Sequence, residues 1–434
     1  MHPTTRNTLA LATVALGLVA TTTLCVLGPS ALADRSDDPY APLDRFARVY
    51  TDIERNYVEE VDPDRLITAA IVGMTDELDR HSRWLDEASF HALEEETEGR
   101  YEGIGVEVRD VDDGALVVRV LPGGPAARDG VKAGDRIVAV DGKDITEADL
   151  DETSRLMKGP RGSRVVLSVV RDGSPVQIET LRDRIDVAPV VAAALPGDIA
   201  YVRLVGFQDG AAAEVQRALK TARRDGVDGG LILDLRDNPG GLLGEAVRVV
   251  DLFVDEGPIV TTRGRVEGEQ VLGATRGGFP PDMPVVVLVN GGSASASEVV
   301  TGALQDLGRA TIIGTRTYGK GSVQTLFNRD GGGLKLTTAR YFTPAGTPVT
   351  ALEGRQPDEV VRHPTELGPK EALRARLAML DHAERADLLA LVDKLPDDPA
   401  VEPVIAWDAP MDSRLRTDPQ LRAALRALGV EPPE

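Results

Sequence analysis

The 434-residue sequence has one cysteine, five histidines and few aromatic residues. A single cysteine, Cys25, allows no internal disulfide and no thiolate metal cluster. Aromatic residues make up 4% of the chain, so aliphatic side chains must fill the core of a protein whose apolar content, 42%, is ordinary. Basic residues are outnumbered, and the formal net charge of −21 repels nucleic-acid phosphates. We therefore expect no nucleic-acid partner.

The N-terminus has the pattern of an export signal. Arg6 precedes an apolar run over residues 9–27, which threonines interrupt, and Ala31-Leu32-Ala33 follows. A basic start, an apolar middle and an A-x-A site predict a signal peptide over residues 1–33, cleaved before Asp34. An uncleaved membrane anchor is the alternative, because the run is nearly long enough to span a bilayer. We expect an exported protein of the bacterial periplasm or cell envelope.

Four segments follow the signal. Residues 40–98 carry apolar side chains at three- and four-residue steps, which is typical of amphipathic helices. Residues 99–183 alternate short β-rich runs with turns and are predicted to form a small β domain. Residues 184–365 alternate strands and helices, which predicts an α/β core, and residues 366–434 are predicted to be a charged helical tail.

The most informative segment follows a predicted buried strand and begins a helix. Residues 290–298 have the sequence NGGSASASE. A strand–turn–helix joint places a side chain at a helix N-terminus, where free backbone N–H groups can stabilise an oxyanion. Ser295 is thus a candidate nucleophile. A purely structural role stays open, because Ser295 and Glu298 have the spacing of a capping box.

A second segment, residues 318–324 with the sequence YGKGSVQ, offers a base for a serine. A serine hydroxyl needs a base to take its proton, and lysine can be that base only when it is neutral. Lys320 lies between two glycines, which permit the close packing that would lower its pKa by desolvation. A surface lysine is one alternative. A phosphate-loop lysine is another, but the segment lacks the G-x-x-x-x-G-K-[ST] pattern.

Histidines are missing from the predicted core. A Ser-His-Asp triad would have to use His81 or His91 from the helical region, and we interpret both as ordinary surface or packing residues. No motif has the spacing of metal ligands, so no metal and no cofactor are expected. Residues 234–241, with the sequence DLRDNPGG, end a buried strand and expose glycine N–H groups. These groups could help to bind an oxyanion, although a simple turn would have the same composition.

These segments, in this order, resemble the carboxy-terminal processing peptidases, also called tail-specific proteases. The resemblance covers nearly the whole chain after the signal and includes further motifs at Leu78–Ser82, Gly103–Val106, Lys132–Asp135, Asp141-Gly142 and Leu336–Tyr341. It implies Ser295 as the nucleophile, Lys320 as the base and Gln324 as the side chain that orients the lysine. It also implies that the backbone N–H groups of Ala296 and of Gly240 or Gly241 bind the oxyanion.

The resemblance also implies an architecture. The core would be an α/β fold of the ClpP–crotonase type, with an inserted β-rich PDZ domain over residues 99–183 and helical N- and C-terminal regions. Gly103, Ile104, Gly105 and Val106 could present successive N–H groups to a peptide carboxylate, beside an edge strand that accepts the peptide by β-addition. A glycine-bearing β-turn is the alternative for this pattern.

The expected function is hydrolysis of peptide bonds through an acyl-enzyme. The expected partners are exported protein substrates with accessible apolar C-termini, further copies of the chain in a homo-oligomer, and an adaptor protein. Two other functions stay open: a catalytically silent PDZ scaffold and a crotonase-like acyl-transfer enzyme. The intact Ser295, Lys320 and Gln324 argue against the scaffold, and the export signal argues against an enzyme of cytosolic CoA esters.

Overall fold

The computed structural model describes residues 40–275, 279–280, 282–349, 354–362 and 410–433. The predicted signal peptide and most of the predicted C-terminal tail therefore lie outside the described residues. The chain divides into two units, Met1–Met74 and Thr75–Glu434. In the ranges that the structure describes, no helix is both long and apolar enough to cross a membrane.

Two helices account for the described part of the first unit, as the apolar periodicity predicts. They are α2 (Ala41–Asn56) and α3 (Pro63–Asp76), and α3 extends two residues into the second unit. The side chain of Asp62 accepts a hydrogen bond from the N–H of Asp64 and so caps α3. The apolar stripe of α2 stays exposed, with Val49 at 53% and Phe46 at 44%.

A six-stranded sheet forms the centre of the second unit, in the order β10-β11-β12-β15-β16-β19. Its strands are β10 (Val190–Leu195), β11 (Ile199–Leu204), β12 (Gly230–Asp234), β15 (Val285–Val289), β16 (Thr311–Gly314) and β19 (Glu359–Val360). All run parallel except β10, which pairs with β11 in the antiparallel direction. Every residue of β12 and β15 is buried, as is usual for parallel strands with both faces covered.

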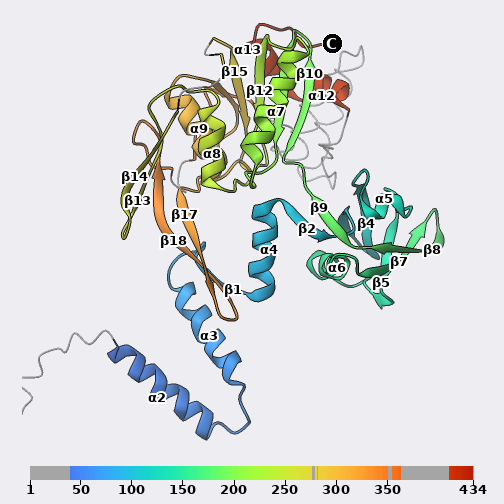
Figure 1. The fold of residues 1–434 in the computed structure, drawn as a ribbon, viewed down its shortest axis with the longest axis vertical. Coiled ribbons are helices and arrows are strands. Elements are labelled where there is room, and N and C mark those ends of the chain that lie inside the picture. Colours follow the sequence, from blue (N-terminus) through green and yellow to red (C-terminus); the bar gives the residue numbers. More distant parts are fainter. Residues whose placement is uncertain (1–39, 276–278, 281, 350–353, 363–409, 434) are drawn as a thin grey trace, which may run out of the picture. The chain divides into compact units, whose positions relative to one another are not determined.

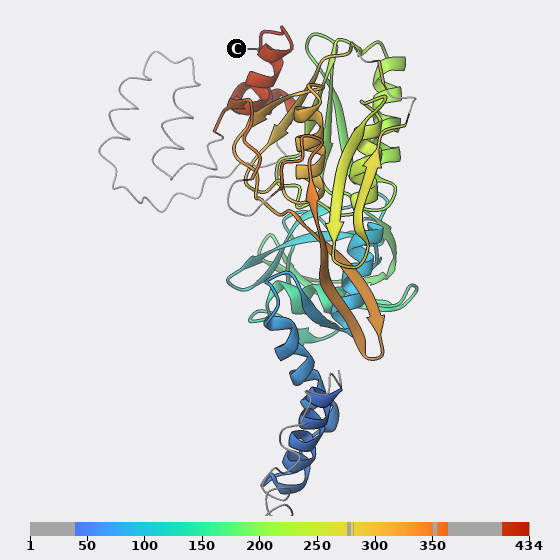
Figure 2. The ribbon, with the colours of Figure 1, turned by 90° about the vertical axis from the view of Figure 1, so that its left-hand side faces the viewer.

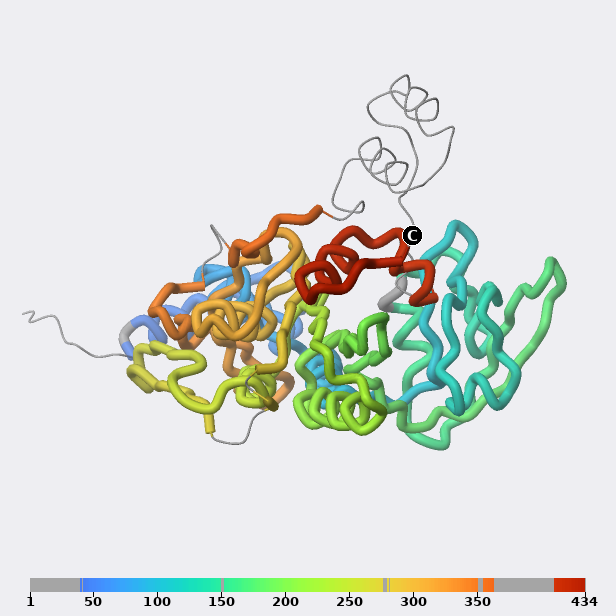
Figure 3. The backbone as a smooth tube through the Cα atoms, turned by 90° about the horizontal axis from the view of Figure 1, so that it is seen from above, coloured from blue at the N-terminus to red at the C-terminus, as the bar shows by residue number. Residues whose placement is uncertain are grey.

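Helices cover both faces of this sheet (Figure 1). They are α7 (Ala211–Arg224), α8 (Leu243–Asp251), α9 (Ala296–Asp306), α12 (Met411–Thr417) and α13 (Pro419–Ala427). The first three pack with Val202, Leu233 and Val287 on one face. The two C-terminal helices pack with Ile232 and Leu288 on the other, and Figure 3 shows them, in red, along the core. The predicted α/β core is confirmed.

A second sheet carries the segment around the predicted base, in the order β1-β18-β13-β14 with β17 beside β18. Its strands are β1 (Arg83–Asp86), β13 (Pro258–Gly264), β14 (Gly268–Gly273), β17 (Ser322–Arg329) and β18 (Gly332–Phe342). The strands β17 and β18 form a long hairpin, orange in Figure 2.

The interpretation of residues 40–98 as wholly helical is wrong at β1. This strand pairs antiparallel with the start of β18, where Arg83 lies opposite Lys335 and Asp86 lies opposite Gly332. The four residues of β1 show no period-2 pattern. The strand forms because β18, from a distant part of the chain, supplies its backbone partners. The helix α4 (Glu87–Glu98) follows directly, and Asp86 caps it by accepting from the N–H of Ser89 at 2.7 Å.

The predicted β domain has a sheet and a core of its own. The sheet order is β3-β4-β5-β7-β8, with β6 beside β5. The elements are β2 (Arg100–Gly103), β3 (Val106–Val111), β4 (Gly114–Val120), α5 (Pro125–Arg128), β5 (Arg136–Val140), β6 (Lys143–Asp144), α6 (Leu150–Met157), β7 (Arg164–Arg171), β8 (Ser174–Leu181) and β9 (Asp183–Asp186). Val117, Ile137 and Leu167 are buried in a separate cluster. The strands β2 and β9, which begin and end this domain in the sequence, pair antiparallel in a separate two-stranded sheet.

Candidate active site

Ser295 lies at a strained turn between β15 and α9. Its φ of +56° and ψ of −113° fall in a region that non-glycine residues rarely adopt, and such strain is concentrated at functional sites. Two neighbouring serines hold the turn, because the hydroxyl of Ser293 donates to the carbonyl of Leu235 and that of Ser297 donates to the carbonyl of Asn238.

One buried carboxylate joins the serine turn to the lysine loop. Glu298 Oε2 accepts from the backbone N–H of Ser295 at 2.9 Å and from that of Lys320 at 2.7 Å. Its other oxygen, Oε1, accepts from the N–H of Gly319 at 2.7 Å and from the hydroxyl of Thr317 at 2.5 Å. Four donors satisfy a carboxylate that is completely buried. The predicted capping box is present at the N-terminus of α9. It does more than cap the helix, because Glu298 also fixes two candidate catalytic residues to each other.

The loop before β17 holds Lys320 in a half-buried position. Gly321 must be glycine, because a Cβ there would lie 1.4 Å from the carbonyl oxygen of Val349. Burial lowers the pKa of the Lys320 ammonium below its ordinary value, and the nearby charge of Lys335 lowers it further, while Glu298 opposes this shift. A lowered pKa is the direction that a lysine base requires.

The hydroxyl of Ser295 bonds to a tyrosine. Its Oγ lies 2.7 Å from the Oη of Tyr341 in β18. No hydrogen bond joins Ser295 Oγ to Lys320 Nζ in the part of the chain that the structure describes. Gln324 is bonded to Ser322 Oγ at 2.8 Å and to Thr337 Oγ1 at 3.3 Å rather than to Lys320. The structure thus joins the backbones of Ser295 and Lys320 through Glu298, but it forms no direct hydrogen bond between the side chains of Ser295, Lys320 and Gln324. Catalytic hydrogen bonds are often long in unliganded enzymes.

Gly240 lies against the serine turn. A Cβ at this position would be 2.9 Å from Ser295 Cβ and 3.0 Å from Ala296 N. The N–H of Gly240 itself donates to Asn238 Oδ1 at 2.9 Å. Within the described residues, the N–H groups of Ala296 and Gly241 have no acceptor. Of the predicted oxyanion donors, these two are therefore available, whereas that of Gly240 is occupied.

Comparison with known proteins places the chain in a family. Residues 198–361 match peptidase family S41, and residues 116–171 match the PDZ domain. The chain is 40% identical over 356 residues to a carboxy-terminal-processing protease of Bartonella bacilliformis, which covers 80% of this chain and 81% of the relative. This chain belongs to the carboxy-terminal processing peptidases of family S41. It is a serine-type peptidase with a PDZ domain.

Two further proteins are similar over most of the chain. The "Probable CtpA-like serine protease" of Staphylococcus aureus strain N315 is 34% identical over 328 residues, which are 75% of this chain and 66% of the relative. The solved structure of a photosystem II D1 C-terminal processing protease is 32% identical and covers 73% of this chain and 92% of that chain, with a TM-score of 0.45.

The PDZ domain of this peptidase has an edge strand that follows two free backbone N–H groups. Its strand β3 lies at the edge of the sheet, next to α6. The N–H groups of Ile104 and Gly105 have no acceptor among the described residues, while their carbonyls accept from Ala126 and Leu121. Gly105 has a φ of +78°, which glycine adopts without strain. Two adjacent free N–H groups beside a free edge suit a peptide C-terminus.

The loop around His81, a histidine that we interpreted from the sequence as an ordinary surface or packing residue, contacts the strand β18. Ser82 Oγ accepts from the N–H of Thr337 at 3.0 Å, which fixes the loop to β18. Burial lowers the pKa of His81, and the charge of Lys320 lowers it further. His91, by contrast, is 72% exposed on α4. The motif Leu78–Ser82 was the only signal that could have found this loop.

A buried ion cluster connects the segment before Gly240 to the C-terminal helices. The guanidinium of Arg236 donates to Asp234 Oδ2 at 2.6 Å, to Asp418 Oδ1 at 3.0 Å and to Gln420 Oε1 at 2.8 Å. Burial would raise the pKa of Asp234, but Arg236 outweighs this effect and the pKa is lowered. The C-terminal helices are therefore tied to the loop that carries Asn238 and are not a separate tail.

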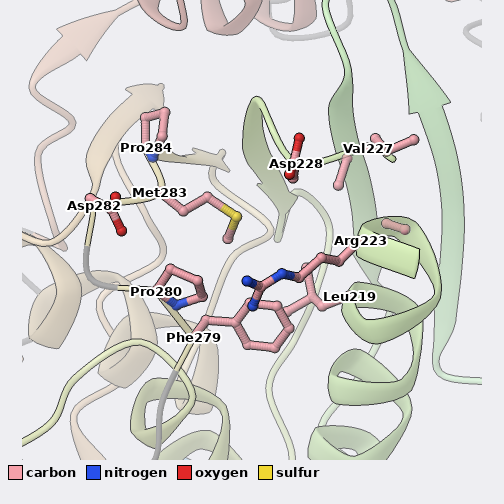
Figure 4. A pocket seen from close by; sticks show the side chains of 11 residues that line it. Leu219, Arg223, Val227, Asp228, Phe279, Pro280, Asp282, Met283 and Pro284 are labelled. Carbon is pink, nitrogen blue, oxygen red and sulfur yellow. The ribbon is translucent and has the colours of Figure 1, made fainter. Parts of the chain in front are cut away.

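Two pockets border α7, away from these residues. One has a volume of about 240 Å³ and includes Arg223, Phe279 and Met283 in its lining (Figure 4). The other, of about 390 Å³, lies between α7 and β10. None of the predicted catalytic residues lines either pocket.

Proposed function

We propose that this peptidase is an exported endopeptidase in which Ser295 is the nucleophile and Lys320 is its general base. The observation that carries the proposal is the buried carboxylate of Glu298, which binds the backbone N–H groups of both residues through one oxygen. A carboxylate shared in this way keeps the two loops in a fixed relation. The lowered pKa of Lys320 favours the neutral amine that the reaction needs.

In the acylation step, Ser295 Oγ bonds to the substrate carbonyl carbon while its proton passes to Lys320 Nζ. The N–H groups of Ala296 and Gly241 would bind the resulting oxyanion. The oxyanion then collapses, the C–N bond breaks, and the leaving amine takes the proton from Lys320. Water attacks the ester and gives its proton to Lys320, which returns a proton to Ser295 Oγ as the acyl C–O bond breaks.

Gln324 would orient the lysine amine once a substrate is bound. Its amide now bonds to Ser322 and Thr337, so a small change of side-chain rotamer has to precede contact with Lys320. We expect Gln324→Ala to lower turnover by about tenfold to a thousandfold, which suits an orienting group rather than a reacting one.

Substrates would be proteins with accessible apolar C-terminal tails. The free N–H groups of Ile104 and Gly105 would bind the terminal carboxylate, and the edge of β3 would pair with the residues before it. Gly103 and Val106 flank this carboxylate site. Binding at the PDZ domain would raise the local concentration of the chain that is to be cut.

Export to the cell envelope, self-association and an adaptor complete the proposal. The N-terminal pattern of the sequence supports export, and the relatives named above come from bacteria. The exposed apolar stripe of α2, which includes Leu43, Phe46, Val49 and Ile53, supports association with a second copy of the chain. Sedimentation of the wild type and of Phe46→Glu would test this, because a charge on the stripe should shift the protein toward the monomer.

The decisive test of activity uses the purified protein and β-casein, which is an unstructured substrate. Wild type should release new peptides, and Ser295→Ala should release none while its circular dichroism is unchanged. A fluorophosphonate probe should label Ser295, as peptide mass spectrometry can verify. Cleavage by Ser295→Ala would refute the proposal. A wild type that binds peptides but neither cleaves β-casein nor reacts with the probe would favour the silent scaffold.

A further inference from the structure

Tyr341 is the one described residue whose side chain is bonded to the hydroxyl of Ser295. It lies in β18, is 3% exposed, and its ring packs in the same apolar cluster as Ala296 and Val299 of α9. Its backbone N–H donates to the carbonyl of Gly321 at 3.0 Å, directly after Lys320. A single residue therefore touches the nucleophile through its side chain and the lysine loop through its backbone.

Packing does not explain the hydroxyl group of Tyr341. A phenylalanine ring would fill the same apolar space, and a buried hydroxyl without a partner costs about 1–3 kcal/mol. In the described chain, Oη has no hydrogen-bond partner except Ser295 Oγ. The contact with the nucleophile is thus the only interaction that accounts for a tyrosine at this position.

Either hydroxyl can donate in this hydrogen bond, and the phenol of Tyr341 is the stronger donor because it is the more acidic of the two groups. Burial raises the pKa of Tyr341 to about 12, so the phenol keeps its proton at physiological pH. That proton has no acceptor in the described residues other than Ser295 Oγ. A serine hydroxyl can accept one hydrogen bond and still donate its own proton. Donation from Tyr341 to Ser295 therefore leaves the serine proton free for Lys320.

We propose that Tyr341 is a third catalytic side chain, whose hydroxyl donates to Ser295 Oγ and holds the nucleophile in place for transfer of its proton to Lys320. The inference rests on the proposed Ser–Lys reaction. Tyr341 keeps its own proton throughout, so the proton balance between Ser295, Lys320 and the leaving amine is unchanged. Its donated hydrogen bond stabilises the negative charge that develops on Oγ as the proton leaves, and it does the same when Oγ is released on deacylation.

The test is Tyr341→Phe, which removes only the hydroxyl. Its matched control is Tyr101→Phe, which makes the same chemical change in β2, outside the catalytic residues. Steady-state kcat and KM would be measured on one fluorogenic peptide, together with the second-order rate of fluorophosphonate labelling. All measurements would be made well below the melting temperature of each variant, so that a loss of stability does not enter the rates.

We expect Tyr341→Phe to lower kcat about tenfold to a hundredfold with KM nearly unchanged, and to slow labelling by a similar factor. Tyr101→Phe should match the wild type. Wild-type or faster turnover by Tyr341→Phe would overturn the inference. The tyrosine would then either hold Ser295 in an unreactive orientation or take no part in catalysis. That result leaves the Ser–Lys proposal intact, whereas cleavage by Ser295→Ala would remove the Ser–Lys proposal itself.

Discussion

Replacement of Glu298 by glutamine tests how firmly the buried carboxylate holds the two loops together. A glutamine has one acceptor oxygen where glutamate has two. The best arrangement keeps that oxygen at the Oε2 position, where it still accepts from Ser295 and Lys320. The new NH₂ group then faces the N–H of Gly319, which loses its acceptor, whereas the hydroxyl of Thr317 can turn.

One buried donor without an acceptor costs about 1–3 kcal/mol, so Glu298→Gln should lower stability by about that amount. Glu298→Ala should cost more, because three backbone N–H groups lose their acceptor together. Turnover should fall in the same order, and further than the folded fraction does, since the loops of Ser295 and Lys320 would no longer be fixed.

Urea unfolding followed by tryptophan fluorescence would measure stability, and β-casein cleavage would measure turnover. Glu269→Gln, a change at the exposed surface of β14, is the matched control and should alter neither property. If Glu298→Gln and Glu298→Ala both unfolded and turned over like the wild type, the carboxylate would not be the joint between the loops.

Three other perturbations have defined outcomes. Lys335→Met removes a positive charge that lowers the pKa of Lys320, so that pKa should rise. Because the base acts only when neutral, the acidic limb of the kcat/KM profile should then move to higher pH, and an unmoved limb would count against the lysine. Amidation of a peptide's C-terminus should weaken its binding to the protein, as fluorescence anisotropy can show. Equal binding of the free and the amidated peptide would show that Ile104 and Gly105 do not bind the terminal carboxylate. Asp418→Ala leaves the buried guanidinium of Arg236 short of one partner and should lower stability by about 3–5 kcal/mol, whereas an unchanged urea midpoint would show that the C-terminal helices do not stabilise the core.

Local patterns were sufficient to predict most elements of the core. The aliphatic runs at β12 and β15 and the strand–turn–helix joint at Ser295 lie where the sequence places them. These features depend on residues close together in the chain, such as the small residues that allow the tight turn and the capping pair of Ser295 and Glu298. The turn chemistry at Gly240 is also local, since its φ of +106° requires glycine.

Contacts between distant segments could not be predicted in this way. The strand β1 has no period-2 pattern of its own and exists because β18 supplies its partners. The bond between Arg236 and Asp418 and the approach of Tyr341 to Ser295 depend on how separate elements pack, which single-sequence periodicity does not encode. The hydrogen bond between Ser82 and Thr337 arises from the same kind of contact, so the loop of His81, remote in sequence, lies against the strand opposite Gln324.

Turnover by Lys320→Arg is the measurement that tests the central claim most directly. Arginine keeps its positive charge at any working pH, so it can occupy the loop but cannot take the proton of Ser295. The account predicts a folded protein with no measurable cleavage of β-casein, at a concentration where the wild type is fully active. Near-normal cleavage by Lys320→Arg would contradict the account and would direct attention to His81 as the base.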